Sequence, residues 1–107
     1  MKVVEYLDPA GRSPFAAWFR RIEARAAAKV TVALARLEGG NLSNTKTVGS
    51  GVLEYRIDYG PGYRVYFGRD GETLVILLAG GTKQRQQRDI ADAQARWLDY
   101  KRRKRGD

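Results

Sequence analysis

Residues 55–83 interleave arginine and tyrosine side chains with apolar side chains at alternate positions. This period of two is typical of β-strands that bury one face, so the segment predicts a sheet with one apolar face and one face that can bind phosphates. The chain contains no histidine and no cysteine. Any reaction on this surface must therefore be carried out by lysine, arginine, tyrosine and carboxylate side chains.

Two arginines of this segment are the best candidates for holding an anion. Arg56 and Arg64 lie on consecutive predicted strands and share one face with Tyr66. A guanidinium group can hold two phosphate oxygens at once, and a tyrosine ring can stack on a nucleobase. Lys46 precedes these strands and Lys83 follows them, so five side chains could gather around one negatively charged substrate.

The net charge of +8 indicates a polyanionic partner, because Lys and Arg gain affinity for nucleic acids by displacing counterions from phosphates. An acidic protein partner would satisfy the same charge. The missing histidine and cysteine exclude thiolate nucleophiles and the usual zinc sites. Metal-dependent nuclease chemistry would then need clustered carboxylates, which the sequence does not show, so we expect neither a metal nor a cofactor.

The chain of 107 residues suits one compact domain. We predict this domain over residues 1–100 and a basic C-terminal tail over residues 101–107, because a block of like charges is typical of a solvated segment that binds nucleic acids without specificity. No apolar run approaches the ~18 residues that a membrane span requires. Glu5 and Asp8 interrupt the apolar start of the chain, unlike a signal peptide. We expect a cytoplasmic protein with no membrane contact.

The apolar spacing predicts an α+β fold. Ser13 and Pro14 are a strong helix start, and two glycines at residues 39–40 are typical of a helix end. Short turns between the later strands require antiparallel neighbours. The predicted elements are a strand over 2–7, a helical hairpin or one bent helix over 14–38, a loop over 41–51, an antiparallel meander of strands over 52–59, 63–69 and 72–79, and a helix over 84–104.

The strand register decides which side chains share a face. If Tyr59 pairs with Tyr63, Arg56 lies beside Tyr66 and Asp58 beside Arg64; a register shifted by two residues is the alternative. In the first register Arg64 could simply form an ion pair with Asp58.

The second turn, at residues 70–71, predicts that Arg69 pairs with Glu72. That register places Leu74 and Ile76 in the core, and Val75 and Leu77 on the face that carries the arginines. A strand that is apolar on both sides indicates that the second face is covered too. The cover would be the C-terminal helix or another protein.

Several motifs in order resemble the RelE/ParE toxin superfamily, in particular the HigB-like addiction-module killer proteins related to a phage Gp49 protein. The motifs are KTVGSGVLEYRI at 46–57, GPGYRVYF at 60–67 and LAGGTK at 78–83, and the similarity extends from FAAW at 15–18 to DIADA at 89–93. The resemblance implies the same α+β architecture: an N-terminal strand and helical hairpin packed on an antiparallel meander with a C-terminal helix.

The resemblance also implies roles for residues of this chain. Arg56 corresponds to a substrate-contacting basic residue of the second strand, Arg64 to a phosphate-binding arginine of the third, and Lys83 to a cation after the last strand. Two positions depart from the pattern. Asp58 stands where ribosome-dependent relatives often have a second basic residue, and Asp89 stands near the position where some have a catalytic tyrosine.

RNA cleavage by internal attack needs a base for the 2′-hydroxyl, stabilisation of the phosphorane and an acid for the leaving oxygen. The arginines suit the second task and Lys83 suits the third. An ordinary lysine is too rarely deprotonated at pH 7 to serve as the base without a lowered pKa, and Asp58 and Glu54 compete for that role, which stays open. The predicted catalytic residues are Arg56, Arg64, Lys83 and Tyr66, and the predicted substrate-binding residues are Lys46 and Arg85.

The sequence therefore predicts the toxin of a toxin–antitoxin module that cuts messenger RNA on the ribosome without a metal. Two alternatives stay open: a non-enzymatic toxin that inhibits DNA gyrase or another protein, and a non-toxic basic RNA-binding module. The resemblance implies a small helix-turn-helix antitoxin as partner, so that DNA is bound only through the complex. We expect this antitoxin to cover the arginine face with an acidic or apolar segment over Val75 and Leu77.

Overall fold

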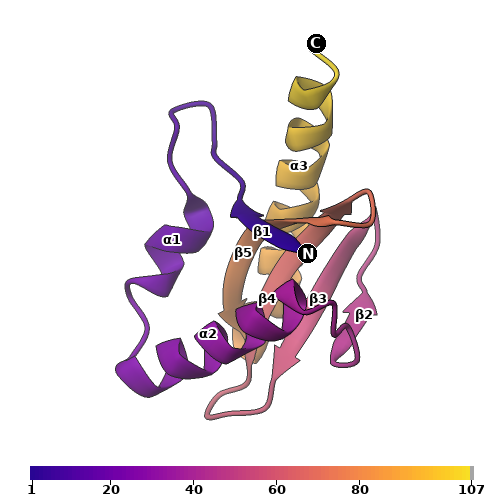
Figure 1. The fold of residues 1–107 in the computed structure, drawn as a ribbon. Helices are drawn as coiled ribbons and strands as arrows, with labels where there is room; N and C mark the ends of the chain where they lie inside the picture. Colours follow the sequence, from indigo (N-terminus) through magenta and orange to yellow (C-terminus); the bar gives the residue numbers. More distant parts are fainter. Residues whose placement is uncertain (107) are drawn as a thin grey trace.

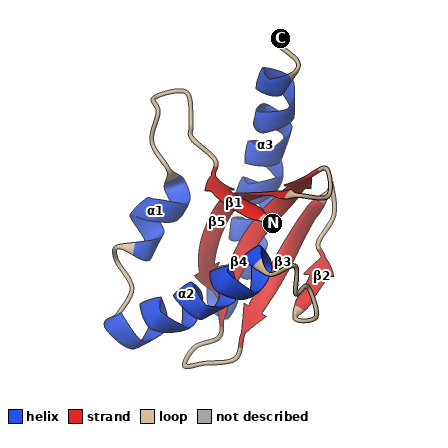
Figure 2. Ribbon diagram, viewed as in Figure 1, coloured by secondary structure: helices blue, strands red, loops and turns tan. Residues whose placement is uncertain are grey.

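The computed structural model of the chain describes residues 1–106, which form one five-stranded sheet with helices on both faces (Figure 1). Helix α2 crosses one face of the sheet and α3 lies against the other (Figure 2). The predicted α+β architecture is confirmed. The elements in order are β1 (Lys2–Glu5), α1 (Pro14–Phe19), α2 (Ala24–Glu38), β2 (Thr45–Thr47), β3 (Val52–Ile57), β4 (Tyr63–Asp70), β5 (Leu74–Thr82), the 3₁₀ helix η1 (Lys83–Arg85) and α3 (Gln86–Lys104).

The N-terminal helices begin where the sequence predicts. Ser13 Oγ accepts a hydrogen bond from the Ala16 amide at 3.0 Å, and Pro14 occupies the first helical position. The chain forms two separate helices here, not one bent helix, because residues 20–23 interrupt the helical backbone. Together α1 and α2 cover one face of the sheet.

Two apolar cores lie on opposite faces of the sheet. The first core packs α1 and α2 against alternate residues of the central strands, and the second packs α3 against the intervening residues. The buried side chains of the first core include Phe15, Trp18, Val30, Leu37, Tyr55, Val65, Phe67, Val75 and Leu77. Those of the second core include Tyr6, Val52, Tyr66, Ile76, Leu78, Ala93 and Trp97. The sheet is therefore buried on both faces, and its second cover is α3.

The register between β3 and β4 is the alternative one, shifted by two residues. Arg56 is the direct cross-strand partner of Arg64, and Glu54 is the partner of Tyr66. A shift by two leaves every side chain on its predicted face. Arg56 and Arg64 therefore do share a face, as the sequence predicts, and Asp58 lies beyond the last β3–β4 pair, which joins Ile57 to Tyr63.

The register between β4 and β5 overturns the prediction for the last strand. Asp70 pairs with Leu74 across a three-residue loop, and Gly71 in that loop has a φ of 71°. The predicted loop was two residues long, and the difference reverses the parity at the start of β5, so residues 74–78 change face. The ladder then shifts by one residue between the pairs Phe67–Leu77 and Tyr66–Ala79, so Ala79 keeps its predicted face. Val75 and Leu77 lie in the first core, whereas Ile76 lies under α3. No partner segment can lie over Val75 and Leu77, because both side chains are already buried in the first core with residues of α1 and α2.

Two edge strands extend the predicted meander into a mixed sheet of order β1-β5-β4-β3-β2. Strand β1 runs parallel to β5, and β2 pairs antiparallel with β3 so that Lys46 lies opposite Glu54. Lys46 therefore stands on an edge strand and not in the predicted loop. A strand of three residues is too short to show alternation in the sequence.

Helix α3 continues past the predicted domain boundary at residue 100 and ends at Lys104. Residues 101–104 of the predicted tail are therefore helical, and residue 107 of that tail lies outside the described residues. Among residues 1–106, none of the helices is long and apolar enough to cross a membrane.

Candidate phosphate-binding site

A buried carboxylate organises the end of the sheet beneath the start of α3. The Glu54 side chain has 0% exposure, and Arg64 Nε lies 2.7 Å from its Oε1 atom. Gln86 Nε2 donates to both carboxylate oxygens, at 2.8 and 3.2 Å, and Lys46 Nζ lies 3.7 Å from Oε2. Donors from β4, α3 and β2 thus converge on one residue of β3. Such a buried charge is tolerated only because it is paired and hydrogen-bonded.

This pairing fixes the position of the Arg64 guanidinium group. The side chain is 10% exposed, and its Nη1 atom donates to the Tyr63 carbonyl at 3.3 Å. Gly62 lies directly against it, since a Cβ atom there would stand 3.1 Å from Nη1. Gly62 also has a φ of 82°, a conformation that favours glycine. The turn between β3 and β4 therefore lies close over one side of the guanidinium group.

A surface hollow of about 360 Å³ opens beside this turn, and we call it the turn hollow. It is lined by Arg56, Asp58, Arg64 and Lys83 together with residues 60–62. The Lys83 amide donates to the Gly62 carbonyl at 2.8 Å, which anchors the end of β5 to the turn. Three cations and one carboxylate therefore face a single hollow.

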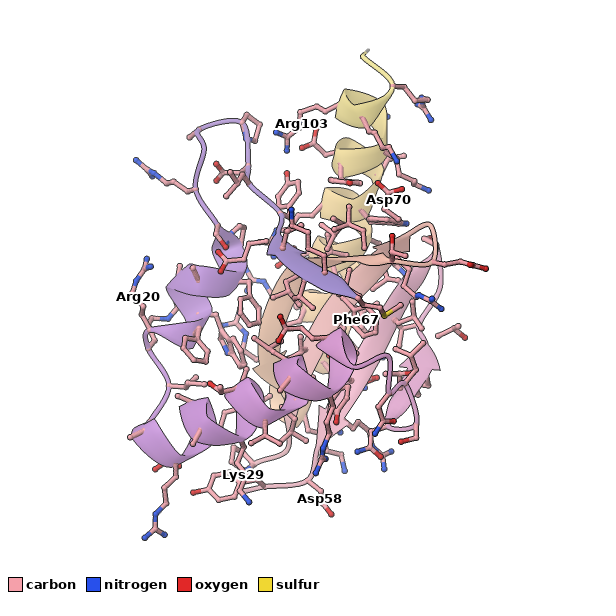
Figure 3. The ribbon with its side chains drawn as sticks, in the orientation of Figure 1. Arg20, Lys29, Asp58, Phe67, Asp70 and Arg103 are labelled. Atoms are coloured by element: carbon pink, nitrogen blue, oxygen red, sulfur yellow. The ribbon has the colours of Figure 1, made fainter. Side chains whose placement is uncertain are left out.

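A second hollow, of about 430 Å³, adjoins the first on the side of β2. Arg56 and Asp58 line both hollows, and Lys46 lines only the second. Figure 3 shows Asp58 beyond the end of β3, with its side chain directed away from the body of the domain. The exposed Arg56 and the fixed Arg64 can hold one anion from two sides, while Asp58 can accept a proton next to it.

The structure brings most of the predicted site residues together. Arg56, Arg64 and Lys83 line the turn hollow, and Lys46 lines the hollow that adjoins it. Arg85 lies elsewhere: it lines a third hollow, between α1 and α3. Lys83 and Arg85 nevertheless belong to the same 3₁₀ helix, η1. This helix lies between the turn hollow and the third hollow.

Tyr66 does not fit the predicted catalytic role. Its side chain is fully buried under α3, and its hydroxyl has no hydrogen-bond partner among the described residues. Burial raises the pKa of this hydroxyl, and the nearby Glu54 and Asp89 carboxylates raise it further. In this structure the ring cannot stack on a base. The sequence correctly placed Tyr66 on the arginine face and expected a helix or another protein to cover part of that face, but it could not show that α3 lies over Tyr66 itself.

Sequence reasoning missed the structural importance of Glu54 and Gln86. Arg64 pairs with Glu54, not with Asp58, so the simple ion pair considered from the sequence exists with a different acid. The sequence carried no signal for the burial of Glu54, because a charged residue between two apolar residues of a strand normally faces solvent. Within residues 1–106, no three His, Cys, Asp or Glu side chains are grouped so that they could hold a metal ion.

Fold and site together define a small α+β protein whose mixed sheet carries an arginine-lined hollow at one end. The family model of the phage-derived Gp49-like proteins (DUF891) matches residues 17–97. The chain therefore belongs to the Gp49-like family, a toxin-like family of toxin–antitoxin modules. An uncharacterized protein of Haemophilus influenzae is similar as well, with 44% identity over 80 residues that cover 74% of this chain and 81% of the relative.

Proposed function

We propose that this protein is the toxin of a toxin–antitoxin module and cuts messenger RNA on the ribosome without a metal. The observation that supports this most is the cross-strand pair of Arg56 and Arg64, which face one hollow together with Lys83. The net charge of +8 favours a phosphate-rich substrate. Family membership supports the toxin role, and the site supports the chemistry.

The reaction that suits these residues is internal transesterification. The 2′-oxygen of the RNA attacks the neighbouring phosphorus while the bond to the 5′-oxygen breaks, which leaves a 2′,3′-cyclic phosphate and a 5′-hydroxyl. Arg56 and Arg64 stabilise the charge that develops on the phosphoryl oxygens. Lys83 donates a proton to the departing 5′-oxygen.

The proposed general base is Asp58. It lines both hollows and is exposed, so its carboxylate can reach a bound 2′-hydroxyl. Glu54, the other acid considered from the sequence, has 0% side-chain exposure and is already bound to Arg64 and Gln86. Glu54 therefore acts on the substrate only through Arg64, as a positioning residue.

The proposed partner is a small helix-turn-helix antitoxin, through which alone the complex would bind DNA. An acidic segment over the turn hollow would neutralise Arg56 and Lys83 and block substrate entry. We propose in addition that the substrate is messenger RNA on the ribosome and that the protein acts in the cytoplasm.

The test expresses the protein without an antitoxin and maps the 5′ ends of cellular messenger RNA. Arg56→Ala and Arg64→Ala should each remove growth arrest and the new RNA ends, because the phosphorane loses a charged donor. Arg36→Ala, which changes an exposed arginine of α2, serves as the matched control. Growth arrest and RNA ends that persist at full strength in both site variants would contradict the proposed site.

A non-enzymatic toxin that inhibits DNA gyrase is the second candidate. Two observations favour it: Arg64 is held inward by Glu54, and Tyr66 is buried. A supercoiling assay with purified gyrase separates the candidates. Inhibition of supercoiling without any new RNA ends would support the second and overturn the first.

A further inference from the structure

The hollow between α1 and α3, which we call the helix hollow, has a volume of about 290 Å³. It exists because β1 pairs with β5 only from Leu74 to Leu77. Beyond that point the outer edge of β5 has no strand partner among residues 1–106. The nearby Trp18 ring and α3 leave an opening over this bare strand edge.

The floor of the helix hollow is backbone. A Cβ atom on Gly80 would stand 2.1 Å from the Trp18 ring, and one on Gly81 would stand 1.8 Å from Asp89 Oδ2. The two glycines therefore let an aromatic ring and a carboxyl group approach the strand closely. Polar peptide groups and two acidic side chains, the buried Asp89 and the exposed Asp92, are left to face whatever enters.

Asp89 is a buried polar group without a partner inside the described part of the chain. It is 8% exposed, and its Oδ2 atom makes no hydrogen bond. Burial raises the pKa of this carboxyl group and the Asp92 carboxylate raises it further, against the lowering effect of Arg85, Arg96 and Arg88. Unsatisfied buried groups are rare in folded proteins because their lost hydration is not repaid, so this one indicates a ligand that supplies the missing hydrogen bond.

Arginines surround the acid. Arg96 Nη1 donates to the Leu78 carbonyl at 3.0 Å, which fixes its guanidinium group at the wall of the hollow. Arg21 and Arg85 are exposed at its margin. Arg85 also belongs to η1, the same short helix that carries Lys83 to the turn hollow. Cations therefore continue from one hollow to the next.

The two hollows are close in space. Gly81, on the floor of the helix hollow, is the direct cross-strand partner of Arg64, on the wall of the turn hollow. Paired strands lie about 4.8 Å apart. An RNA strand with one phosphate at Arg64 can thus place an adjoining nucleotide in the helix hollow.

We propose that the helix hollow is a nucleobase subsite, in which Asp89 hydrogen-bonds an adenine or cytosine that adjoins the phosphate bound at Arg56 and Arg64. Both bases present an amino group beside a ring-nitrogen acceptor. A carboxyl group in its neutral form presents the complementary acceptor and donor, and its O–H bonds more strongly to a ring nitrogen than to the carbonyl oxygen that uracil and guanine offer beside their ring N–H. Arg85 and Arg21 bind the backbone of the same nucleotide. This inference rests on the proposed RNA substrate and extends it to base preference.

The test uses the full chain and 2′-O-methyl dinucleotides, which cannot be cleaved because they lack the attacking hydroxyl. Four homodinucleotides, of adenine, cytosine, guanine and uracil, are titrated into ¹⁵N-labelled protein. The indole N–H of Trp18 and the amide of Gly80 report on the helix hollow, and the amides of Gly62 and Lys83 report on the turn hollow. Adenine and cytosine should shift all four signals, with a lower Kd than uracil.

Two substitutions at Asp89 test its role in the helix hollow. Asp89→Ala should weaken binding of the adenine and cytosine probes about tenfold, by removing a hydrogen bond in a buried site. Asp89→Asn should stay within about twofold, because an amide presents the same acceptor and donor. Glu72→Gln, which removes one exposed negative charge from a distant turn, controls for net charge. Melting curves of each variant show whether the fold is kept.

The outcomes separate this inference from the proposed function. Shifts at Gly62 and Lys83 without shifts at Trp18 and Gly80 would overturn the subsite and leave the phosphate site standing. Equal affinity for all four bases, or unchanged affinity in Asp89→Ala, would also overturn the subsite. Dinucleotides that shift none of the four signals would count against the proposed RNA substrate itself.

Discussion

Arg64 Nε lies 2.7 Å from Oε1 of Glu54, a carboxylate with no exposed surface. The arginine that faces the candidate substrate is therefore held by an acid that the substrate never touches. This contact joins stability to function, because the same ion pair supports the sheet and aims the guanidinium group.

Glu54→Ala should destabilise the fold strongly, because it leaves Arg64 buried without its partner. Breaking one side of a buried ion pair typically costs about 3–5 kcal/mol. Urea denaturation of the purified variant measures the loss. Glu72→Ala, at an exposed turn, should change stability by less than about 0.5 kcal/mol. A Glu54→Ala variant as stable as the parent would show that the pair contributes nothing net.

Gly68→Ala should destabilise the second core. A Cβ atom at Gly68 would stand 2.5 Å from the Trp97 ring, and overpacking of this kind costs about 1–3 kcal/mol. Gly39→Ala is the matched control, because its nearest neighbours would be 3.5 Å away and its φ of −77° suits alanine. Thermal unfolding followed by tryptophan fluorescence compares the two, and equal melting temperatures would refute the close approach of Trp97.

Ionisation of the Asp70 carboxyl group should make the stability of the domain depend on pH in the acidic range. Hydrogen bonds from Lys104 and Tyr100 hold the pKa of this carboxyl group below its ordinary value of 3.8. A lowered pKa means that the stabilisation is complete above pH 3.8 and is lost as the pH falls through the lower folded-state value. Asp70 in turn helps to raise the pKa of Tyr100 to about 12, after burial of the ring.

The corresponding experiment compares the parent with Asp70→Asn. The variant should melt at a lower temperature at pH 7, and the difference should shrink as the pH falls below 3.8. A difference that stays constant across this range would mean that the ionised carboxylate is not what stabilises the fold.

Truncation after Tyr100 should weaken nucleic-acid binding without abolishing RNA cleavage, because the removed cations lie outside both hollows. The structure adds a second effect. Lys104 and Arg103 form ion pairs with Asp70 and Asp99, so the truncated protein should also melt at a lower temperature.

Arg102→Gln separates the two effects of truncation, because it removes an exposed charge and keeps both ion pairs. It should reduce the slope of log K against log salt by about 0.7 if Arg102 contacts one phosphate of single-stranded RNA. Unchanged salt dependence after truncation would contradict a role of this segment in binding.

Local signals made the helices and the central hairpin predictable. Ser13 and Pro14 start α1 by the mechanism expected of them. The alternation that places Arg56 and Arg64 on one face survives in the structure, because a shift of two residues preserves parity.

The remaining features depend on contacts that the sequence does not display. One extra residue in the loop before Leu74 exchanges the faces of the side chains that follow it, so Val75 and Leu77 lie in the first core. The burial of Tyr66 depends on where α3 lies, and the partner of Arg64 depends on the β3–β4 register. The sequence therefore predicted which cations belong to the candidate site, but not how their side chains are paired or buried.

The parallel pairing of β1 with β5 has a consequence for biosynthesis. Residues 2–5 leave the ribosome well before residues 74–77, which are their partners. Strand β1 stays without its partner until residues 74–77 have been translated, because contacts so distant along the chain form late. A nascent copy therefore cannot complete its sheet, or the proposed site that the sheet supports, before residue 77 has been translated.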